Sequence, residues 1–329
     1  MALLRWGILG CGNVAEKKGG PPLYTVEDSE LIAVMRRSRE KAEAFSAKHG
    51  AKRVYHTVDA LLADEEINAI YVATPPHLHC EHTVRAAEAG KHVLCEKPMA
   101  MNVDECRQML DACREHGVTL MIAYYRRFYP NVVKMKQLIA EGAIGDVVLA
   151  RVNHTGFYNP SYHEWGAWRI DQEFSGGGVL TDLGSHRIDL LLHLLGDIES
   201  ACGYAETVQF EYPVDDSAVF TLRFKNGGHA VANINWNVGV SVDEIEIYGT
   251  KGSLLCRPLN SGNLVLHTKG KSQPMNQPPL KYTHVGLVED FVNHLRKGTP
   301  ICCTGQEGLK TNRIIAEIYA NSRQVKVDA

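Results

Sequence analysis

A glycine-rich turn directly after an apolar run is the feature of this sequence that most constrains its fold. The run Leu4–Leu9 leads into Gly10-Cys11-Gly12-Asn13-Val14-Ala15, which has the spacing GxGxxA. In this pattern the first glycine makes a tight turn, the second lets the backbone approach a diphosphate, and the small sixth residue lets a helix pack closely on a sheet. The start of that helix favours the anion. The turn therefore predicts a dinucleotide site that includes Gly10, Gly12, Asn13 and Val14.

Apolar runs and helical segments continue to alternate through residue 122. The expected strands cover residues 4–9, 31–35, 69–73, 92–95 and 118–122. The expected helices between them cover residues 40–49, 58–63, 79–89 and 103–116, and three of them end at Gly50, Gly90 and Gly117. Strands that alternate with helices form a parallel sheet covered on both faces. We therefore expect a doubly wound Rossmann domain over residues 1–122.

The pattern changes after residue 122, and we expect a second domain over residues 123–329. Its expected strands cover residues 147–154, 200–209, 218–224, 229–236 and 244–248, and its expected helices cover residues 132–141, 285–296 and 308–322. Asn226-Gly227-Gly228 between two of the strands predicts a hairpin, whereas residues 259–280, rich in Gly, Pro, Asn and Lys, predict loops. The chain is thus expected to be an α/β protein whose second domain, an α+β domain, holds a mostly antiparallel sheet. The C-terminal helix can pack back on the first domain.

The composition excludes several classes of protein. A formal net charge of −3 argues against nucleic-acid binding, which normally needs a basic surplus. No apolar run approaches the ~20 residues that span a membrane, and the first residues lack the features of a secretory signal. The nine cysteines have no paired spacing, as in reduced intracellular proteins. We therefore expect a cytoplasmic protein with neither a nucleic-acid nor a membrane partner.

The end of the second expected strand bears on the choice between NAD and NADP. An acidic residue there would bind the ribose 2′-hydroxyl of NAD, but this chain has Arg36-Arg37-Ser38-Arg39. Guanidinium groups suit a 2′-phosphate. We expect Arg36, Arg37 and Ser38 to bind the cofactor and NADP to be preferred, with NAD as the alternative; a solvated basic loop is the other interpretation.

Two more segments lie at the carboxyl ends of expected strands, where ligands of open α/β sheets bind. Thr74-Pro75-Pro76-His77 forms a stiff rim, and Glu96-Lys97-Pro98 aims a lysine, because a residue before proline is restricted to extended geometry. We expect cofactor contacts from Thr74, Pro75, His77, Glu96 and Lys97. The spacing of His77, His79 and His82 matches no standard metal motif, so no metal site is expected.

A second candidate reactive segment follows three glycines, Gly176-Gly177-Gly178. Asp182 and His186 are four residues apart and share one face of the expected helix. Gly184 between them costs roughly 1 kcal/mol relative to alanine, which suggests a close approach by another group. A capping aspartate and a core histidine are the structural alternative.

These motifs together resemble the family of glucose-fructose oxidoreductase, inositol dehydrogenase and their relatives. The resemblance rests on GILGCGNVA, CEKP and GGGVLTDLGSHRIDLLLHLLG, in that order, and it covers essentially the whole chain. Further matching pieces lie at residues 123–130, at Trp168-Arg169 and at residues 249–253. The resemblance implies a Rossmann domain followed by a domain with a large open sheet, whose exposed face often forms a dimer or tetramer interface in relatives.

The resemblance also implies roles for particular residues. The lysine of the family's EKP motif maps onto Lys97, and the aspartate and histidine that act with it in the inositol dehydrogenase branch map onto Asp182 and His186. Branches related to glucose-fructose oxidoreductase and dihydrodiol dehydrogenase carry a tyrosine in place of His186. Trp168-Arg169 resembles a pair that lies against the cofactor in some relatives, and Arg126 falls in a matching piece expected to bind cofactor.

The implied chemistry is hydride transfer between a nicotinamide and a secondary alcohol or ketone carbon. His186 is the expected acid or base, Asp182 its orienting partner, and Lys97 the group that stabilises the substrate oxygen. The residues expected to line the substrate site are Lys97, Tyr158, His163, Trp165, Asp182 and His186. A sugar or its keto derivative is the first expected substrate, before a cyclic polyol or dihydrodiol. A non-catalytic dinucleotide-binding regulator, an NAD-dependent glycosidase and a sugar epimerase remain alternatives.

Overall fold

The computed structural model describes residues 3–161, 164 and 166–327, in two compact units. The first unit comprises Met1–Tyr125 and Lys281–Lys310, and the second comprises Arg126–Leu280 and Thr311–Ala329. The segment Lys281–Lys310 therefore groups with the Rossmann unit, whereas the expected domain limits assigned it to the second domain. Two contacts explain the grouping: Phe291 packs against Trp6, with ring centroids 5.5 Å apart, and the amide of Ile122 donates to the carbonyl of Cys303.

The first unit is built on a six-stranded sheet with the order β3-β2-β1-β4-β5-β6, and all of its strand pairs are parallel. Its strands are β1 (Leu4–Leu9), β2 (Ser29–Met35), β3 (Arg53–Tyr55), β4 (Ala69–Val72), β5 (His92–Cys95) and β6 (Leu120–Ile122). The central strands are buried on both faces, as their continuous apolar runs predict. The prediction of a Rossmann sheet is confirmed; β3, short and only half-buried, was not predicted.

Helices of the first unit lie where the sequence placed them, except after the glycine turn. They are α1 (Pro22–Thr25), α2 (Arg39–His49), α3 (Val58–Leu62), α4 (His79–Glu88), α5 (Val103–Glu115) and α9 (Val285–Lys297). Instead of one regular helix after the turn, a π-helical turn at Ala15–Gly19 precedes the short α1. The interruption follows from Gly20, Pro21 and Pro22, because proline cannot donate a hydrogen bond within a helix.

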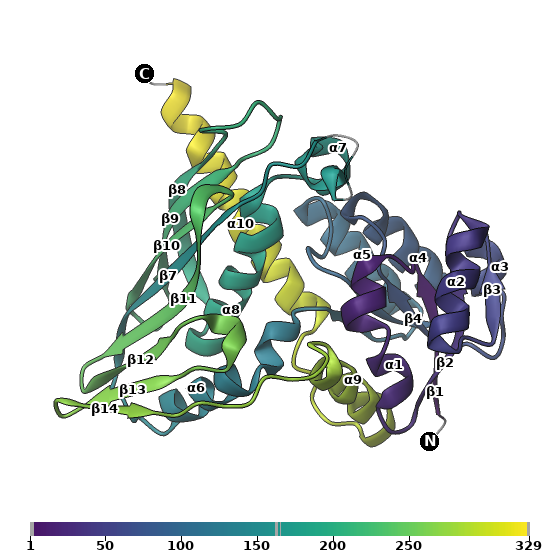
Figure 1. Ribbon diagram of the computed structural model, residues 1–329, viewed down its shortest axis with the longest axis horizontal. Helices are drawn as coiled ribbons and strands as arrows, with labels where there is room; N and C mark the ends of the chain where they lie inside the picture. The colour runs from purple at the N-terminus through teal and green to yellow at the C-terminus, as the bar shows by residue number, and fades with distance from the viewer. Residues whose placement is uncertain (1–2, 162–163, 165, 328–329) are drawn as a thin grey trace. The chain divides into compact units, whose positions relative to one another are not determined.

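The second unit is built on an eight-stranded sheet with the order β14-β13-β12-β11-β7-β10-β9-β8 (Figure 1). Its strands are β7 (Val147–Phe157), β8 (Ile198–Glu206), β9 (Ser217–Phe224), β10 (His229–Asn235), β11 (Asn237–Gly249), β12 (Gly252–Cys256), β13 (Val265–Thr268) and β14 (Lys271–Pro274). Neighbouring strands are antiparallel except for β10 and β7. The predicted mostly antiparallel sheet is confirmed, and so is the hairpin at Asn226-Gly227-Gly228, where both glycines have a positive φ.

In the described part of the chain, the helices of this unit pack against one face of the sheet. The helices of this part of the chain are α6 (Pro130–Ala140), α7 (Gln172–Ser175), α8 (Ser185–Leu195) and α10 (Gly305–Val327), of which α10 begins in the first unit. Figure 1 shows α6, α8 and α10 on the same side of the sheet. Residues along β9 and β10 alternate between buried and solvent-accessible, as a sheet covered on one face requires. Among the described residues, no helix is both long and apolar enough to cross a membrane.

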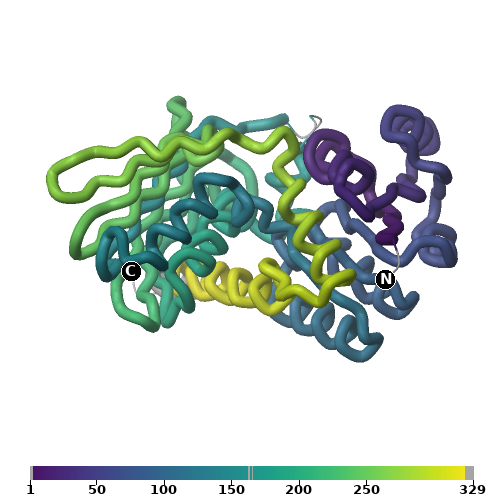
Figure 2. The backbone as a smooth tube through the Cα atoms, turned by 90° about the horizontal axis from the view of Figure 1, so that it is seen from below, coloured from purple at the N-terminus to yellow at the C-terminus, as the bar shows by residue number. Residues whose placement is uncertain are grey.

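The prediction of loops over residues 259–280 is wrong in part, because β13 and β14 form a hairpin there (Figure 2). All four residues of β14 are exposed, so this edge strand lacks the alternation of apolar residues that reveals a half-buried strand. Its turn, Lys269-Gly270, has a positive φ at both residues, which favours a tight hairpin.

Candidate active site

The two glycines of the turn that was predicted to bind a diphosphate have different surroundings. Gly10 has φ +89°, and a Cβ there would lie 2.9 Å from the carbonyl oxygen of Ala73. A Cβ on Gly12, in contrast, would meet only the Gly10 carbonyl oxygen, 4.0 Å away. The first glycine therefore packs the turn onto the carboxyl end of β4, and the second opens a space that another molecule's phosphates can approach. The turn fits a dinucleotide.

The three residues predicted to choose between NAD and NADP have different surroundings. Arg36 donates from Nη1 to the carbonyl oxygen of Cys11, 3.0 Å away, and so supports the glycine turn. Arg37 and Ser38 are exposed at the end of β2. Arg39, the next residue, pairs with Glu43 on the surface of α2. Arg37 and Ser38 thus remain accessible to a ligand, whereas Arg36 is engaged by the turn.

The rim after β4 is fixed to the segment after β5 by a buried histidine. Nδ1 of His79 lies 2.9 Å from the carbonyl oxygen of Pro98 and Nε2 lies 2.8 Å from that of Thr74, and the neutral ring donates to one of the two. The hydroxyl of Thr74 also lies 3.1 Å from Nδ1 of buried His82. The two predicted ligand segments of the first unit are therefore joined through side chains.

Lys97 is the one partly exposed residue between Val93 and Ala100. Its neighbour Glu96 is buried, and Oε1 of that carboxylate accepts hydrogen bonds from Tyr71 (2.5 Å) and from Nε2 of His284 (3.0 Å). Burial alone would raise the pKa of Glu96, but His284, Tyr71 and Lys97 together lower it to about 2. Tyr71 and His284 were not predicted as site residues, because neither belongs to a local motif.

In the second unit, Asp182 pairs with Arg169. Nε of Arg169 lies 3.4 Å from Oδ2 of Asp182, and its guanidinium also stacks on Trp168, 4.4 Å from the ring centroid. Tyr158 donates to the carbonyl oxygen of Gly166 (2.9 Å) close to the same guanidinium. Burial raises the pKa of Tyr158, and nearby Arg169 partly offsets the shift. Tyr158, Arg169 and Asp182 thus form one polar cluster.

The glycine run before Asp182 is explained by Asp215. A Cβ on Gly178 would lie 1.9 Å from the carbonyl oxygen of Asp215, so only glycine fits there. The buried carboxylate of Asp215 accepts from the amides of Gly178 (2.7 Å) and Leu180 (2.8 Å) and from the hydroxyl of Tyr319 (2.5 Å). Asp215 therefore caps the segment that carries Asp182, a role that the sequence did not reveal.

That segment is a π-helical turn, Leu180–Gly184, which runs directly into α8 with buried His186. A Cβ on Gly184 would lie 2.9 Å from the end of the Leu180 side chain of the same turn, and the close approach of another group to Gly184 stays a prediction. The next residues of α8 form buried ion pairs: Arg187 with Asp243 (2.5 Å) and Asp189 with Arg127 (2.6 Å). His186 is thus carried by a helix anchored by charge pairs.

The remaining predicted residues fall into three groups. Arg126, predicted to bind cofactor, belongs to the second unit and contacts Asp243 (3.4 Å) and Asn260 (2.9 Å) there. Pro75 and His77 lie half-buried on the rim, and Asn13 and Val14 follow Gly12. His163 and Trp165 lie outside the described residues. Lys97 lies in the first unit, whereas Asp182 and His186 lie in the second, and the meeting of these three side chains stays a prediction.

Comparisons with known proteins identify the family. Residues 4–124 match the family "Oxidoreductase family, NAD-binding Rossmann fold", and residues 132–255 match the "GFO/IDH/MocA C-terminal domain". The chain is 30% identical to 1,5-anhydro-D-fructose reductase of Ensifer adhaerens over 340 residues, which cover 98% of each protein.

Two solved structures share the whole architecture. Aldose-aldose oxidoreductase from Caulobacter crescentus, complexed with glycerol, matches with a TM-score of 0.89 and 29% identity over 98% of each chain. The WlbA dehydrogenase from Bordetella pertussis, in complex with NADH and UDP-GlcNAcA, matches with a TM-score of 0.88 and 25% identity over 98% of this chain and 96% of that one. As its separated motifs predicted, the chain belongs to the GFO/IDH/MocA family of oxidoreductases, with an NAD-binding Rossmann fold.

Proposed function

We propose that this oxidoreductase transfers a hydride between a nicotinamide and a secondary alcohol or ketone carbon of a sugar, polyol or keto-sugar. The observation that carries the proposal is the polar cluster of Tyr158, Arg169 and Asp182, one helical turn from buried His186. A phenol, a guanidinium and a carboxylate side by side suit the several hydroxyls of one small substrate. The similarity to enzymes named for anhydrofructose and aldoses supports the same substrate class.

In the proposed reaction His186 and Lys97 act on the substrate hydroxyl, and Asp182 acts on His186. His186 takes the hydroxyl proton during oxidation and returns it during reduction. Asp182 stabilises the imidazolium, and the Lys97 ammonium donates to the substrate oxygen where negative charge develops. Arg169, 3.4 Å from Asp182, holds that carboxylate in place. The nicotinamide, when bound, accepts or supplies the hydride.

NADP is the proposed cofactor of choice, with NAD as the alternative. Arg37 and Ser38 are exposed at the end of β2, where the adenosine ribose of a Rossmann ligand lies. A guanidinium and a hydroxyl suit a 2′-phosphate. Arg36 contributes to cofactor binding indirectly: it supports the glycine turn, because it donates to the carbonyl oxygen of Cys11.

A screen of sugars, polyols and keto-sugars with NADP and with NAD, followed by absorbance of the reduced nicotinamide, tests the proposal. We expect net formation or consumption of reduced cofactor with at least one sugar. Conversion of a sugar without any net change in reduced cofactor would instead indicate a glycosidase or an epimerase. Cofactor binding without turnover of any compound would favour the regulator, and turnover of a dihydrodiol alone would overturn the sugar assignment.

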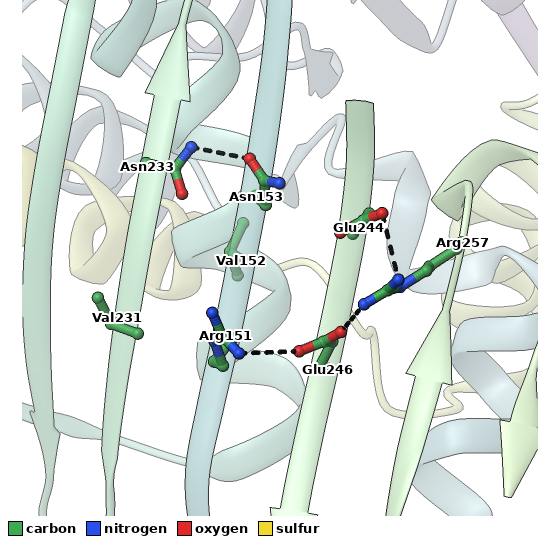
Figure 3. Close-up of a pocket in the computed structure, with 8 residues that line it drawn as sticks. All are labelled: Arg151, Val152, Asn153, Val231, Asn233, Glu244, Glu246 and Arg257. Carbon is green, nitrogen blue, oxygen red and sulfur yellow. Dashed lines mark hydrogen bonds and ion pairs between the residues drawn. The ribbon is translucent and has the colours of Figure 1, made fainter. Parts of the chain in front are cut away.

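The open face of the eight-stranded sheet is the proposed interface of a homodimer or homotetramer. It carries exposed apolar side chains on neighbouring strands, Val219 and Val231. Figure 3 shows a groove on the same face in which Arg151 and Arg257 both reach Glu246. Alternating charges on one surface can pair with a second copy.

We also propose a cytoplasmic location, because all nine cysteines are free.

A further inference from the structure

We infer that His284 is a positioning residue for Lys97: together with Tyr71 it fixes the Glu96 carboxylate, which in turn holds the backbone of the Glu-Lys-Pro turn. The inference rests on the proposed catalytic role of Lys97. His284 stands 188 positions from Glu96 in the sequence, in the segment Lys281–Lys310 that returns to the first unit.

The two oxygens of Glu96 have different partners. Oε1 accepts from the Tyr71 hydroxyl (2.5 Å) and from His284 (3.0 Å), and Oε2 accepts from the backbone amide of Lys97 (3.3 Å). Tyr71 and His284 are completely buried. Because water does not reach these partners, each hydrogen bond restricts the carboxylate more than a surface contact would. The orientation of the Glu96 carboxylate therefore influences the position of the Lys97 backbone amide.

The acceptor atoms of this cluster determine which nitrogen of His284 carries a hydrogen. An ionised carboxylate can only accept hydrogen bonds, so Nε2 of His284 carries a hydrogen. Nδ1 of His284 lies 3.0 Å from the hydroxyl of Thr283, which can donate or accept. Two donors thus converge on Oε1, and this leaves Oε2 directed at the Lys97 amide.

The partners of Glu96 are themselves held in place. A Cβ on Gly19 would lie 2.2 Å from the Tyr71 hydroxyl oxygen, so the π-helical turn after the cofactor motif packs directly on that hydroxyl. The ring of His284 stacks on Tyr125 with centroids 4.5 Å apart and an interplanar angle of 25°, and Nζ of Lys18 lies over the other ring at 5.5 Å. The cluster therefore connects the glycine turn to the Glu-Lys-Pro turn.

The residue after Lys97 is fixed independently. His79 lies within hydrogen-bond distance of the carbonyl oxygens of Pro98 and Thr74 and is completely buried. Glu96 and Pro98 are thus both anchored, and Lys97 between them is the residue whose side chain reaches solvent. Anchors on both sides fix the backbone that carries the amine.

The test compares His284→Phe with His284→Gln in the full-length protein. Phenylalanine keeps a ring against Tyr125 but cannot donate to Glu96, whereas glutamine retains an N–H donor. Hydrogen exchange of the peptide spanning residues 94–100, NADH affinity, and kcat and KM for the substrate found by screening are measured. His294→Phe is the matched control, because His294 lies on α9, the helix that His284 precedes, and bonds to Thr299.

For His284→Phe we expect amide exchange in the 94–100 peptide to rise roughly tenfold or more and kcat to fall by a similar factor, since a lost hydrogen bond to a charged group has about this effect. NADH affinity and KM should change less than kcat, and His284→Gln should recover most of the loss. Tyr71→Phe removes the other donor and should act in the same direction, which keeps the inference testable if His284→Phe does not fold.

Unchanged exchange and kcat in both His284→Phe and Tyr71→Phe would overturn the inference. So would equal losses in His284→Phe and His284→Gln, because they would indicate packing rather than the hydrogen bond. The exchange measurement needs no substrate. If no sugar is turned over and exchange still rises, the proposed function fails while the link from His284 to the Lys97 backbone holds.

Discussion

The two units hold their candidate catalytic side chains by different means. In the first unit one buried carboxylate, Glu96, is surrounded by hydrogen-bond donors beside Lys97. In the second, α8 carries His186 next to two buried charge pairs, Arg187 with Asp243 and Asp189 with Arg127. Removing a donor from Glu96 should loosen one turn, whereas removing half of a charge pair leaves an isolated charge inside the unit. Removing a donor from Glu96 should therefore affect turnover more than stability, whereas removing half of a charge pair in the second unit should mainly reduce stability.

The largest expected effect is on stability, from Asp189→Asn. The Arg127–Asp189 pair is nearly completely buried, and Nε and Nη2 of the guanidinium both donate to the carboxylate. Neutralising the carboxylate leaves a buried cation without its counter-charge, which should lower the free energy of unfolding by about 3–5 kcal/mol. Urea unfolding of the full-length chain measures the loss.

Asp197→Asn is the matched control, because Asp197 pairs with Lys225 on the surface. That change should cost less than about 1 kcal/mol. Equal losses in the two variants would show that burial of the pair does not set its contribution, and the contrast between the units would then fail.

The next largest effect is on catalysis, from Lys97→Met. Methionine has a similar length but no charge, so the developing alkoxide loses its donor while the surrounding fold is retained. We expect kcat to fall by about 10²–10³-fold, with NADPH affinity and unfolding free energy close to those of the wild type. Lys91→Met changes the buried lysine that donates to the carbonyl oxygens of Asp64 and Ile67, and should instead reduce stability. Near-normal turnover in Lys97→Met would remove Lys97 from the mechanism.

The same contrast explains what the sequence could and could not predict. Gly10, Gly12 and Lys97, whose roles stay predictions, were identifiable as candidates because their chemistry depends on neighbours within a few residues, and Asp182 and His186 as further candidates because they stand four residues apart on one segment. His284 and Asp215 were not, because their partners lie 188 and about 35 residues away and nothing local marks the pairing. Long-range hydrogen bonds are determined by tertiary packing, which a single sequence does not display.

The strands show the same limit. Strands buried on at least one face, such as β4 and β9, were predicted from their apolar pattern. The exposed edge strand β14 was not, because all four of its residues are exposed and show no apolar alternation. Arg169 was predicted to lie against the cofactor, which stays a prediction, and its pairing with Asp182 was not predicted. A motif identified the residue, but its partner depended on how the segments pack.

A smaller effect is expected on the acid stability of the first unit. The pKa of Glu96 is about 2 in the folded chain, below the ~4.3 of an unfolded glutamate, so the folded state binds this proton less readily. Its contribution, roughly 3 kcal/mol, is fully present above about pH 4.5 and is lost as the pH falls toward 2. Glu96→Gln should therefore flatten the dependence of unfolding free energy on pH in that window. An unchanged slope would show that the buried carboxylate is not linked to folding.

The smallest effect is expected on cofactor choice. Arg37 is exposed at the end of β2, so its removal should leave stability unchanged and affect only a ligand that carries a 2′-phosphate. In Arg37→Ala the ratio of NADPH to NADH affinity should fall about tenfold, since one charge-assisted hydrogen bond contributes roughly 1.5–3 kcal/mol. Arg39→Ala is the control, because Arg39 pairs with Glu43.

Arg36→Ala should weaken the binding of both cofactors alike, since Arg36 supports the glycine turn through the Cys11 carbonyl. If Arg36→Ala lowers the affinity for NADPH alone, Arg36 contacts the 2′-phosphate itself and the division of roles between the two arginines is wrong.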